Sequence, residues 1–75
     1  MSKYVYKIQD LKTGKYSLGG VPPTFNKSGK LWTSLKNIKL HLNIIKNNNI
    51  LEVYKNAIVE CYELEHFKDV SVDRF

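Results

Sequence analysis

The sequence lacks the features that mark secreted, membrane or disulfide-stapled proteins. Cys61 is the only cysteine among 75 residues, so no intramolecular disulfide can form. No apolar signal-like run follows Met1, and no stretch of about 18 apolar residues is present to span a membrane. These absences predict a protein of a reducing cytoplasm without membrane contact.

Acidic residues are scarce in the first part of the chain. Residues 1–46 hold nine lysines and Asp10 as the one carboxylate, a net charge of +8, whereas residues 47–75 hold three basic and six acidic residues, a net charge of −3. This asymmetry is typical of a basic face that meets an anionic partner. Lysines that only solubilise a small surface are the alternative.

Metal-ligand spacings are also missing. His41, His66 and Cys61 form neither a Cys-x-x-Cys pair nor two histidines at i and i+4. We therefore expect structural roles for all three residues, and neither a metal nor a cofactor.

No catalytic set accompanies the acidic residues near the end of the chain. Strand alternation would turn Glu60 away from Glu63 and Glu65, and no nucleophile or positioning histidine lies nearby. The sequence predicts a solvated acidic edge, no catalytic residues and no enzymatic activity.

A glycine-lysine pair precedes the predicted helix but does not make a P-loop. That motif needs a glycine where Thr24 stands and Ser or Thr where Leu31 stands. A weaker anion site remains, because free backbone N–H groups of residues 33–36 and nearby lysines favour negative charge. The predicted anion or nucleic-acid contacts are Lys27, Lys30, Trp32 and Lys36.

The first 32 residues predict a hairpin followed by a stiff connection. Residues 4–10 alternate as a strand, Thr13-Gly14 fits a turn with Gly14 at positive φ, and residues 15–18 form the second strand. Gly19-Gly20 then lets the backbone leave the hairpin, and Pro22-Pro23 restricts the conformation of the segment that follows. We expect the "NKSGK" turn, closed by the aromatic residues on either side of it, to present its lysines from a rigid mount.

A helix is predicted to begin after Thr33 or Ser34 and to run to about Lys46. The spacing of apolar residues along this helix predicts which of its side chains face the core. The predicted core residues are Leu35, Ile38, Leu42 and Ile45, together with Ile8 and Val59.

Residues 50–64 fit helical spacing and also a β-branched strand. We favour a turn over 51–54 and a strand over 57–64, because a two-stranded hairpin under one helix needs a third strand. The whole chain is then one α+β domain, a short antiparallel sheet packed on one helix in the order β-β-α-β. Residues 66–75 are either an edge strand or an extension.

Aromatic residues interleave with lysines, a pattern that also occurs on base-stacking sheets. The more common role of aromatics in a small domain is its core, which we expect here. The residues are Tyr4, Tyr6, Tyr16, Phe25 and Trp32.

Two aliphatic residues fall on the side of the predicted helix that should be polar. Leu40 and Ile44 lie at i and i+4 away from the core stripe, beside Lys36 and Lys39. They predict a partner-binding surface, unless apolar residues of the segment 67–72 cover them.

Three runs of the sequence resemble small phage-encoded proteins of unassigned function: "YKIQDLKTGKYSLGG", "GKLWTSLKNIKLHL" and "VECYEL". The shared pattern covers roughly residues 4–64 and supplies no catalytic residues, and the segment after Glu65 has no counterpart in it. The resemblance implies a viral origin and a role in the infected cell, in host takeover or defence evasion.

The sequence therefore predicts a non-enzymatic protein that binds a host macromolecule in the host cytoplasm, with a protein target preferred. Self-association, such as a homodimer, is a further possibility. The alternative is a nucleic-acid or nucleotide-binding module that uses the basic face.

Overall fold

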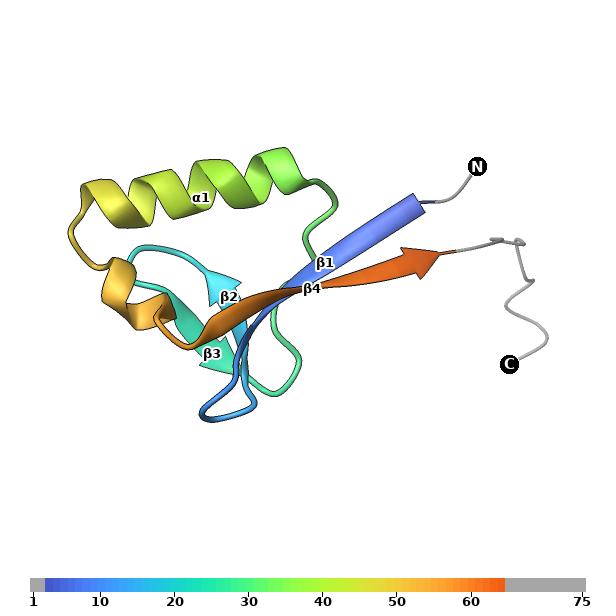
Figure 1. The fold of residues 1–75 in the computed structure, drawn as a ribbon, viewed down its shortest axis with the longest axis horizontal. Coiled ribbons are helices and arrows are strands. Elements are labelled where there is room, and N and C mark those ends of the chain that lie inside the picture. Colours follow the sequence, from blue (N-terminus) through green and yellow to red (C-terminus); the bar gives the residue numbers. More distant parts are fainter. Residues whose placement is uncertain (1–2, 65–75) are drawn as a thin grey trace.

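The computed structural model describes residues 3–64, which form a four-stranded antiparallel sheet covered by one long helix (Figure 1). In chain order the elements are β1 (Lys3–Asp10), β2 (Tyr16–Gly19), β3 (Thr24–Asn26), α1 (Leu35–Asn47), the 3-10 helix η1 (Leu51–Tyr54) and β4 (Ala57–Leu64). The order across the sheet is β3-β2-β1-β4. The α+β prediction is confirmed, and the short strand β3 adds to the predicted β-β-α-β order. The predicted extension at 66–75 lies outside the described residues.

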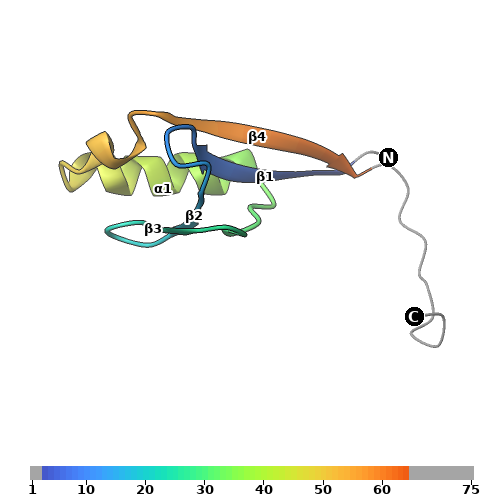
Figure 2. The same cartoon turned by 90° about the horizontal axis from the view of Figure 1, so that it is seen from below.

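The longest pairing joins β1 to β4. Their antiparallel ladder runs from Lys3 opposite Leu64 to Asp10 opposite Ala57, so every residue of both strands is paired. Figure 2 shows β4 lying along β1 over this whole length. The strand interpretation of 57–64 is thus confirmed over the helical one, because β1 provides a partner for the entire segment.

The turn between β1 and β2 is held by its own side chains. The Asp10 carboxylate accepts hydrogen bonds from the Thr13 backbone N–H at 3.1 Å and the Thr13 hydroxyl at 2.8 Å. Gly14 follows at φ 75°, as predicted. Beyond this turn the two strands separate, since their one paired position is Gln9 opposite Tyr16.

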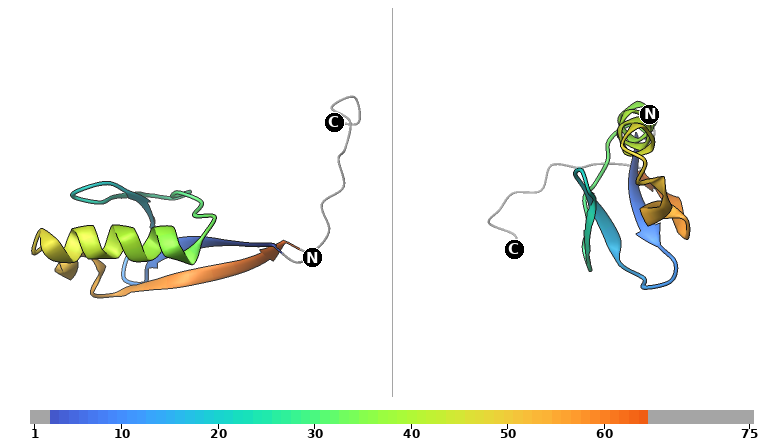
Figure 3. Two further views of the ribbon diagram at one scale, coloured as in Figure 1. Left: turned by 90° about the horizontal axis from the view of Figure 1, so that it is seen from above. Right: turned by 90° about the vertical axis from the view of Figure 1, so that its left-hand side faces the viewer.

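Residues 30–32 bridge the space between β1 and β2. The Lys30 N–H donates to the Ser17 carbonyl at 2.9 Å, which ties the segment to β2. Trp32 and Tyr6 exchange two backbone hydrogen bonds of 2.8 Å, which tie it to β1. The sheet therefore opens into two halves, with β1 and β4 on one side, β2 and β3 on the other, and α1 above them (Figure 3).

Both ends of α1 are capped, and its N-cap Ser34 is one of the two residues after which the sequence predicts the helix to begin. The Ser34 hydroxyl accepts a hydrogen bond from the Asn37 N–H at 3.1 Å, satisfying a donor that the first turn leaves free. At the other end the Asn48 side chain donates to the Ile44 carbonyl at 2.7 Å. No helix of residues 3–64 is long and apolar enough to cross a membrane.

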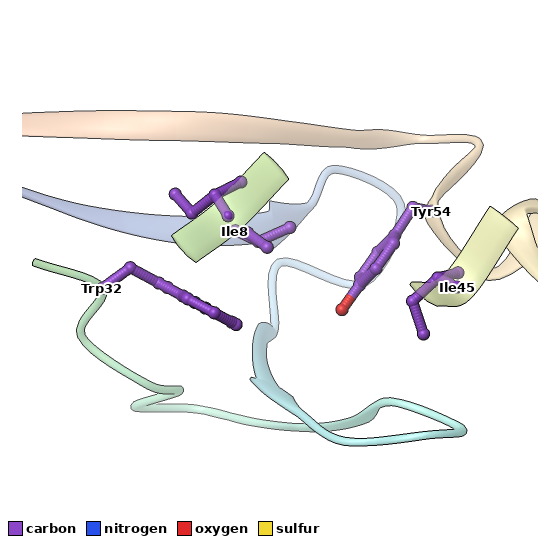
Figure 4. Close-up of a cluster of buried hydrophobic side chains, with 5 residues drawn as sticks. Ile8, Trp32, Ile45 and Tyr54 are labelled. Carbon is purple, nitrogen blue, oxygen red and sulfur yellow. The ribbon is translucent and has the colours of Figure 1, made fainter. Parts of the chain in front are cut away.

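In the part of the chain that the structure describes, five buried hydrophobic side chains form the core: Ile8, Trp32, Ile38, Ile45 and Tyr54. They come from β1, the bridging segment, α1 and η1, and Figure 4 shows Trp32 and Tyr54 on opposite sides of Ile8. His41 is also buried on the same helix face, between Ile38 and Ile45 along α1. The imidazole thus shares the core with aliphatic residues.

Two predicted core positions are wrong. Leu35 is 50% exposed and Val59 is 42% exposed, while Leu42 only packs against the edge of the core. The helix is turned so that His41 faces inward, which moves Leu35 outward in the first turn. Val59 lies on an edge strand, where α1 covers its neighbour Ile8 but not Val59 itself.

Candidate binding surface

The side of α1 away from the sheet carries the aliphatic pair predicted from the sequence. Leu40 is 52% exposed and Ile44 is 48% exposed. They follow the buried Ile38 by two and six positions, which places them about 160° and 120° around the helix from it. With the exposed Lys36 and Lys39 they form a surface that we name the outer face of α1.

The outer face of α1 is basic as well as apolar. The helix carries three lysines and no acidic residue. The ion pair found among residues 3–64 joins Lys55 to Glu52 at 3.8 Å, away from this surface. Within the described part of the chain, Lys36 and Lys39 therefore have no carboxylate partner.

The "NKSGK" turn is held by hydrogen bonds within it and to β1. The Asn26 side-chain oxygen accepts hydrogen bonds from the backbone N–H groups of Ser28 and Gly29. The Lys7 ammonium donates to the Ser28 carbonyl at 2.8 Å and lies 4.9 Å from the Tyr16 ring centre. This scaffold leaves the Lys27 side chain exposed.

The structure places the other predicted anion contacts on separate elements. Lys30 lies in the bridging segment with its ammonium 4.2 Å from the Trp32 ring centre, and Lys36 lies in the first turn of α1. Trp32 is only 5% exposed, and Gly19 lies so close that a Cβ there would come within 3.4 Å of the ring. Trp32 thus serves the core and presents no free ring face for stacking.

A buried polar network, which the sequence did not predict, runs through the core. The Tyr54 hydroxyl shares hydrogen bonds of 2.6 Å with the Ser17 hydroxyl and 2.7 Å with His41 Nε2. The Ser17 hydroxyl also accepts from the Gly19 N–H at 3.0 Å. The one available signal was the place of His41 at the edge of the core stripe.

Burial sets the titration of this network. Burial of the imidazole, and then the charge of Lys30, hold the pKa of His41 below its usual 6.5. Burial likewise raises the pKa of Tyr54. Ser17 bonds to Tyr54 and is fully buried, so its hydroxyl is neither activated by His41 nor open to a substrate.

Within the described range, the glutamates of β4 lie on opposite faces of the sheet, as strand alternation predicts. Glu60 lies opposite Lys7 and Glu63 opposite Tyr4, on different faces of the sheet. The Tyr62 hydroxyl donates to Glu60 at 2.8 Å, and this bond raises the pKa of Tyr62. Cys61 is an exposed strand residue, while Glu65 and His66 lie outside the described residues.

An apolar cleft of about 480 Å³ lies where α1, η1 and β4 meet. Leu42 and Leu51 line it from the two helices, and Ile58 and Val59 line it from β4. Glu52, Tyr54 and Lys55 also line it, and residues 3–64 hold no cluster of metal ligands. The mainly aliphatic lining of the cleft suits the burial of apolar side chains.

Comparison with known proteins adds no assignment. No protein-family model, curated protein or solved structure matches the chain. The resemblance to phage-encoded proteins stays a prediction, and function is argued from the geometry.

Proposed function

We propose that the protein is a non-enzymatic binding domain whose outer α1 face contacts an acidic region of a partner protein. One observation carries this proposal: the exposed pair Leu40 and Ile44 lies among lysines that have no carboxylate partner in residues 3–64. Following the resemblance to phage proteins, we propose a host protein as the partner, bound in the cytoplasm of the infected cell.

The two parts of the surface have different roles in binding. Burying an aliphatic side chain contributes about 1.5 to 3 kcal/mol, so Leu40 and Ile44 supply affinity. Lys36 and Lys39 steer an acidic surface into place and reject a basic one. For the same reason a second copy of this helix face is a poor partner, because its lysines would meet like charges.

The position of the aromatic residues favours protein over nucleic acid. Base stacking needs exposed rings. Trp32 belongs to the core, and Phe25 and Tyr6 pack against it. The core prediction was wrong for Tyr4, which is 45% exposed near the start of β1 because the core extends only to the other part of that strand. An exposed aliphatic pair also contributes nothing to phosphate contacts, whereas it suits an apolar protein surface.

Affinity capture from nuclease-treated host lysate tests this function. We expect Leu40→Ser with Ile44→Ser to remove acidic proteins that the wild-type chain retains. The matched control is Leu11→Ser with Leu31→Ser, because these leucines are at least as exposed as the helix pair but lie off the helix. Capture that survives the helix substitutions would refute the surface, and capture that disappears with nuclease would indicate a nucleic-acid binder.

A further inference from the structure

The outer edge of β4 is free in the described part of the chain. β4 stands last in the order β3-β2-β1-β4, and its eight residues pair with β1 on one side only. The backbone groups along its other side have no strand partner among residues 3–64. Long edge strands normally carry charged side chains, proline or a bulge to prevent pairing. β4 carries the charged Glu60 and Glu63 but no lysine, proline or bulge.

Exposed side chains accompany this free edge. Val59 lies opposite Ile8, and Cys61 lies opposite Tyr6, so both face the same side of the sheet as α1. Both are nevertheless exposed, because α1 does not extend over β4. Val59 also lines the apolar cleft. An added strand with apolar residues on its helix side would cover this row.

We propose that this edge is a strand-docking site and that its occupant is the segment 68–74 of the same chain. Val70 and Val72 alternate there with polar residues, the pattern of a strand with one apolar face. The polar positions are Asp69, Ser71 and Asp73. The outward backbone groups of β4 are those of its odd-numbered residues, because Tyr6, opposite Cys61, bonds Trp32 on its other side. The segment follows β4 directly, so it can return antiparallel along this edge after a four-residue hairpin loop.

One register matches the side chains of both strands. With residues 64–67 as the loop, the opposed pairs on the helix side are Glu63 with Lys68, Cys61 with Val70, and Val59 with Val72. This register joins opposite charges and covers Val59 with an apolar side chain. A loop longer by two residues would place Val70 opposite Glu63 and Arg74 opposite Val59, so the shorter loop is favoured.

The docking site is separate from the outer face of α1, and its test is independent of the proposed function. A fifth strand would satisfy the outer backbone groups of β4 and narrow the apolar cleft beside Val59. It would also prevent any other extended segment from adding to the sheet.

The single native cysteine allows a direct test in the full chain. Directly opposed residues of antiparallel strands lie close enough for a disulfide. In Val70→Cys we therefore expect an intrachain disulfide with Cys61 under mild oxidation. The control is Ser71→Cys, one position along, whose side chain would face the other side of the sheet. We expect the first variant to oxidise at least about tenfold faster, because docking raises the effective concentration of its thiol.

Non-reducing mass measurement and thiol titration separate the outcomes. Faster intrachain oxidation of Val70→Cys supports the docked strand. Equal rates in the two variants, or no disulfide in either, would overturn it. Disulfide-linked dimers of Val70→Cys would also overturn it, since they would assign the edge to a second copy of the chain.

Discussion

At the residue scale, Tyr54 is the side chain on which the polar part of the core depends. Its hydroxyl bonds both the buried Ser17 and the buried His41. Removing that oxygen leaves two enclosed polar groups without their partner. Such groups cost far more than an exposed hydrogen bond because water cannot replace the lost contact.

We therefore expect Tyr54→Phe to lower the free energy of unfolding by about 1 to 3 kcal/mol for each group left unsatisfied. Urea denaturation measures the change. Tyr62→Phe is the matched control, since it removes an exposed hydroxyl that bonds Glu60, and surface changes of this kind stay within about 0.5 kcal/mol. Equal losses in the two variants would show that the network does not hold the core.

His41 makes the stability of the domain depend on pH. Its pKa in the folded state is lowered below 6.5, so the folded chain binds this proton less readily than the unfolded chain. Stability is full above pH 6.5 and falls as the pH drops from 6.5 toward the lowered pKa. The sign follows because protonation then favours the unfolded state.

Urea midpoints measured across this pH range test the assignment. We expect the wild-type midpoint to fall with decreasing pH from about 6.5, and we expect His41→Gln to lose that part of the slope. A slope that is unchanged in His41→Gln would mean that another group titrates.

Single positions were predictable where the cause is local. The Ser34 cap and the positive φ of Gly14 depend on neighbours within a few residues, and both are confirmed. The Tyr54 network was not predictable, because its members lie 37 and 13 positions apart in the sequence. Only the fold brings Ser17 and His41 to one hydroxyl.

At the element scale, Gly29 fixes how the basic turn lies on β2. Its φ is 70°, and a Cβ at this position would overlap the Cβ of Tyr16. The turn therefore packs against the strand at a distance that no other residue allows. Gly14 has a similar φ of 75° but open space around it.

The two glycines give a matched pair of substitutions. Gly14→Ala should cost about 1 to 2 kcal/mol of stability, the usual penalty of left-handed backbone for a residue with a Cβ. Gly29→Ala should cost this amount and about 1 to 3 kcal/mol more, because the methyl group overpacks the contact with Tyr16. Thermal unfolding compares them, and equal shifts would refute the close packing of the turn.

Whether a segment is a strand or a helix was easier to predict than which of its side chains point into the core. Alternation in residues 4–10 and the cap at Ser34 predicted β1 and α1, since both signals lie within the segment itself. The rotation of α1 was missed because Leu35 and His41 compete for the core, and an apolar scale favours leucine. In the structure the His41 imidazole takes the buried position because it packs against aromatic rings. The Trp32 ring centre is 5.2 Å away.

At the scale of the whole molecule, a small core coexists with extensive exposed apolar surface. Within the described range 3–64, five hydrophobic residues are buried. Exposed apolar residues of the same range include Leu40 and Ile44 on α1 and Ile58 and Val59 on β4. These groups occupy different surfaces, one beside lysines and one beside glutamates. A domain of this size thus has room for two distinct contacts, and the predicted charge asymmetry separates them.

The central claim is that an acidic partner protein contacts the outer face of α1. It is tested most directly by comparing two double variants that change the net charge equally at different sites. Lys36→Glu with Lys39→Glu alters the helix, and Lys12→Glu with Lys15→Glu alters the exposed β1–β2 turn by an equal charge. The measurement is the amount of each protein captured from nuclease-treated lysate. We predict a loss of at least about tenfold for the helix variant only, because like charges opposed across an interface are strongly unfavourable. An equal loss in both variants would contradict the claim, since it would reduce the interaction to net charge.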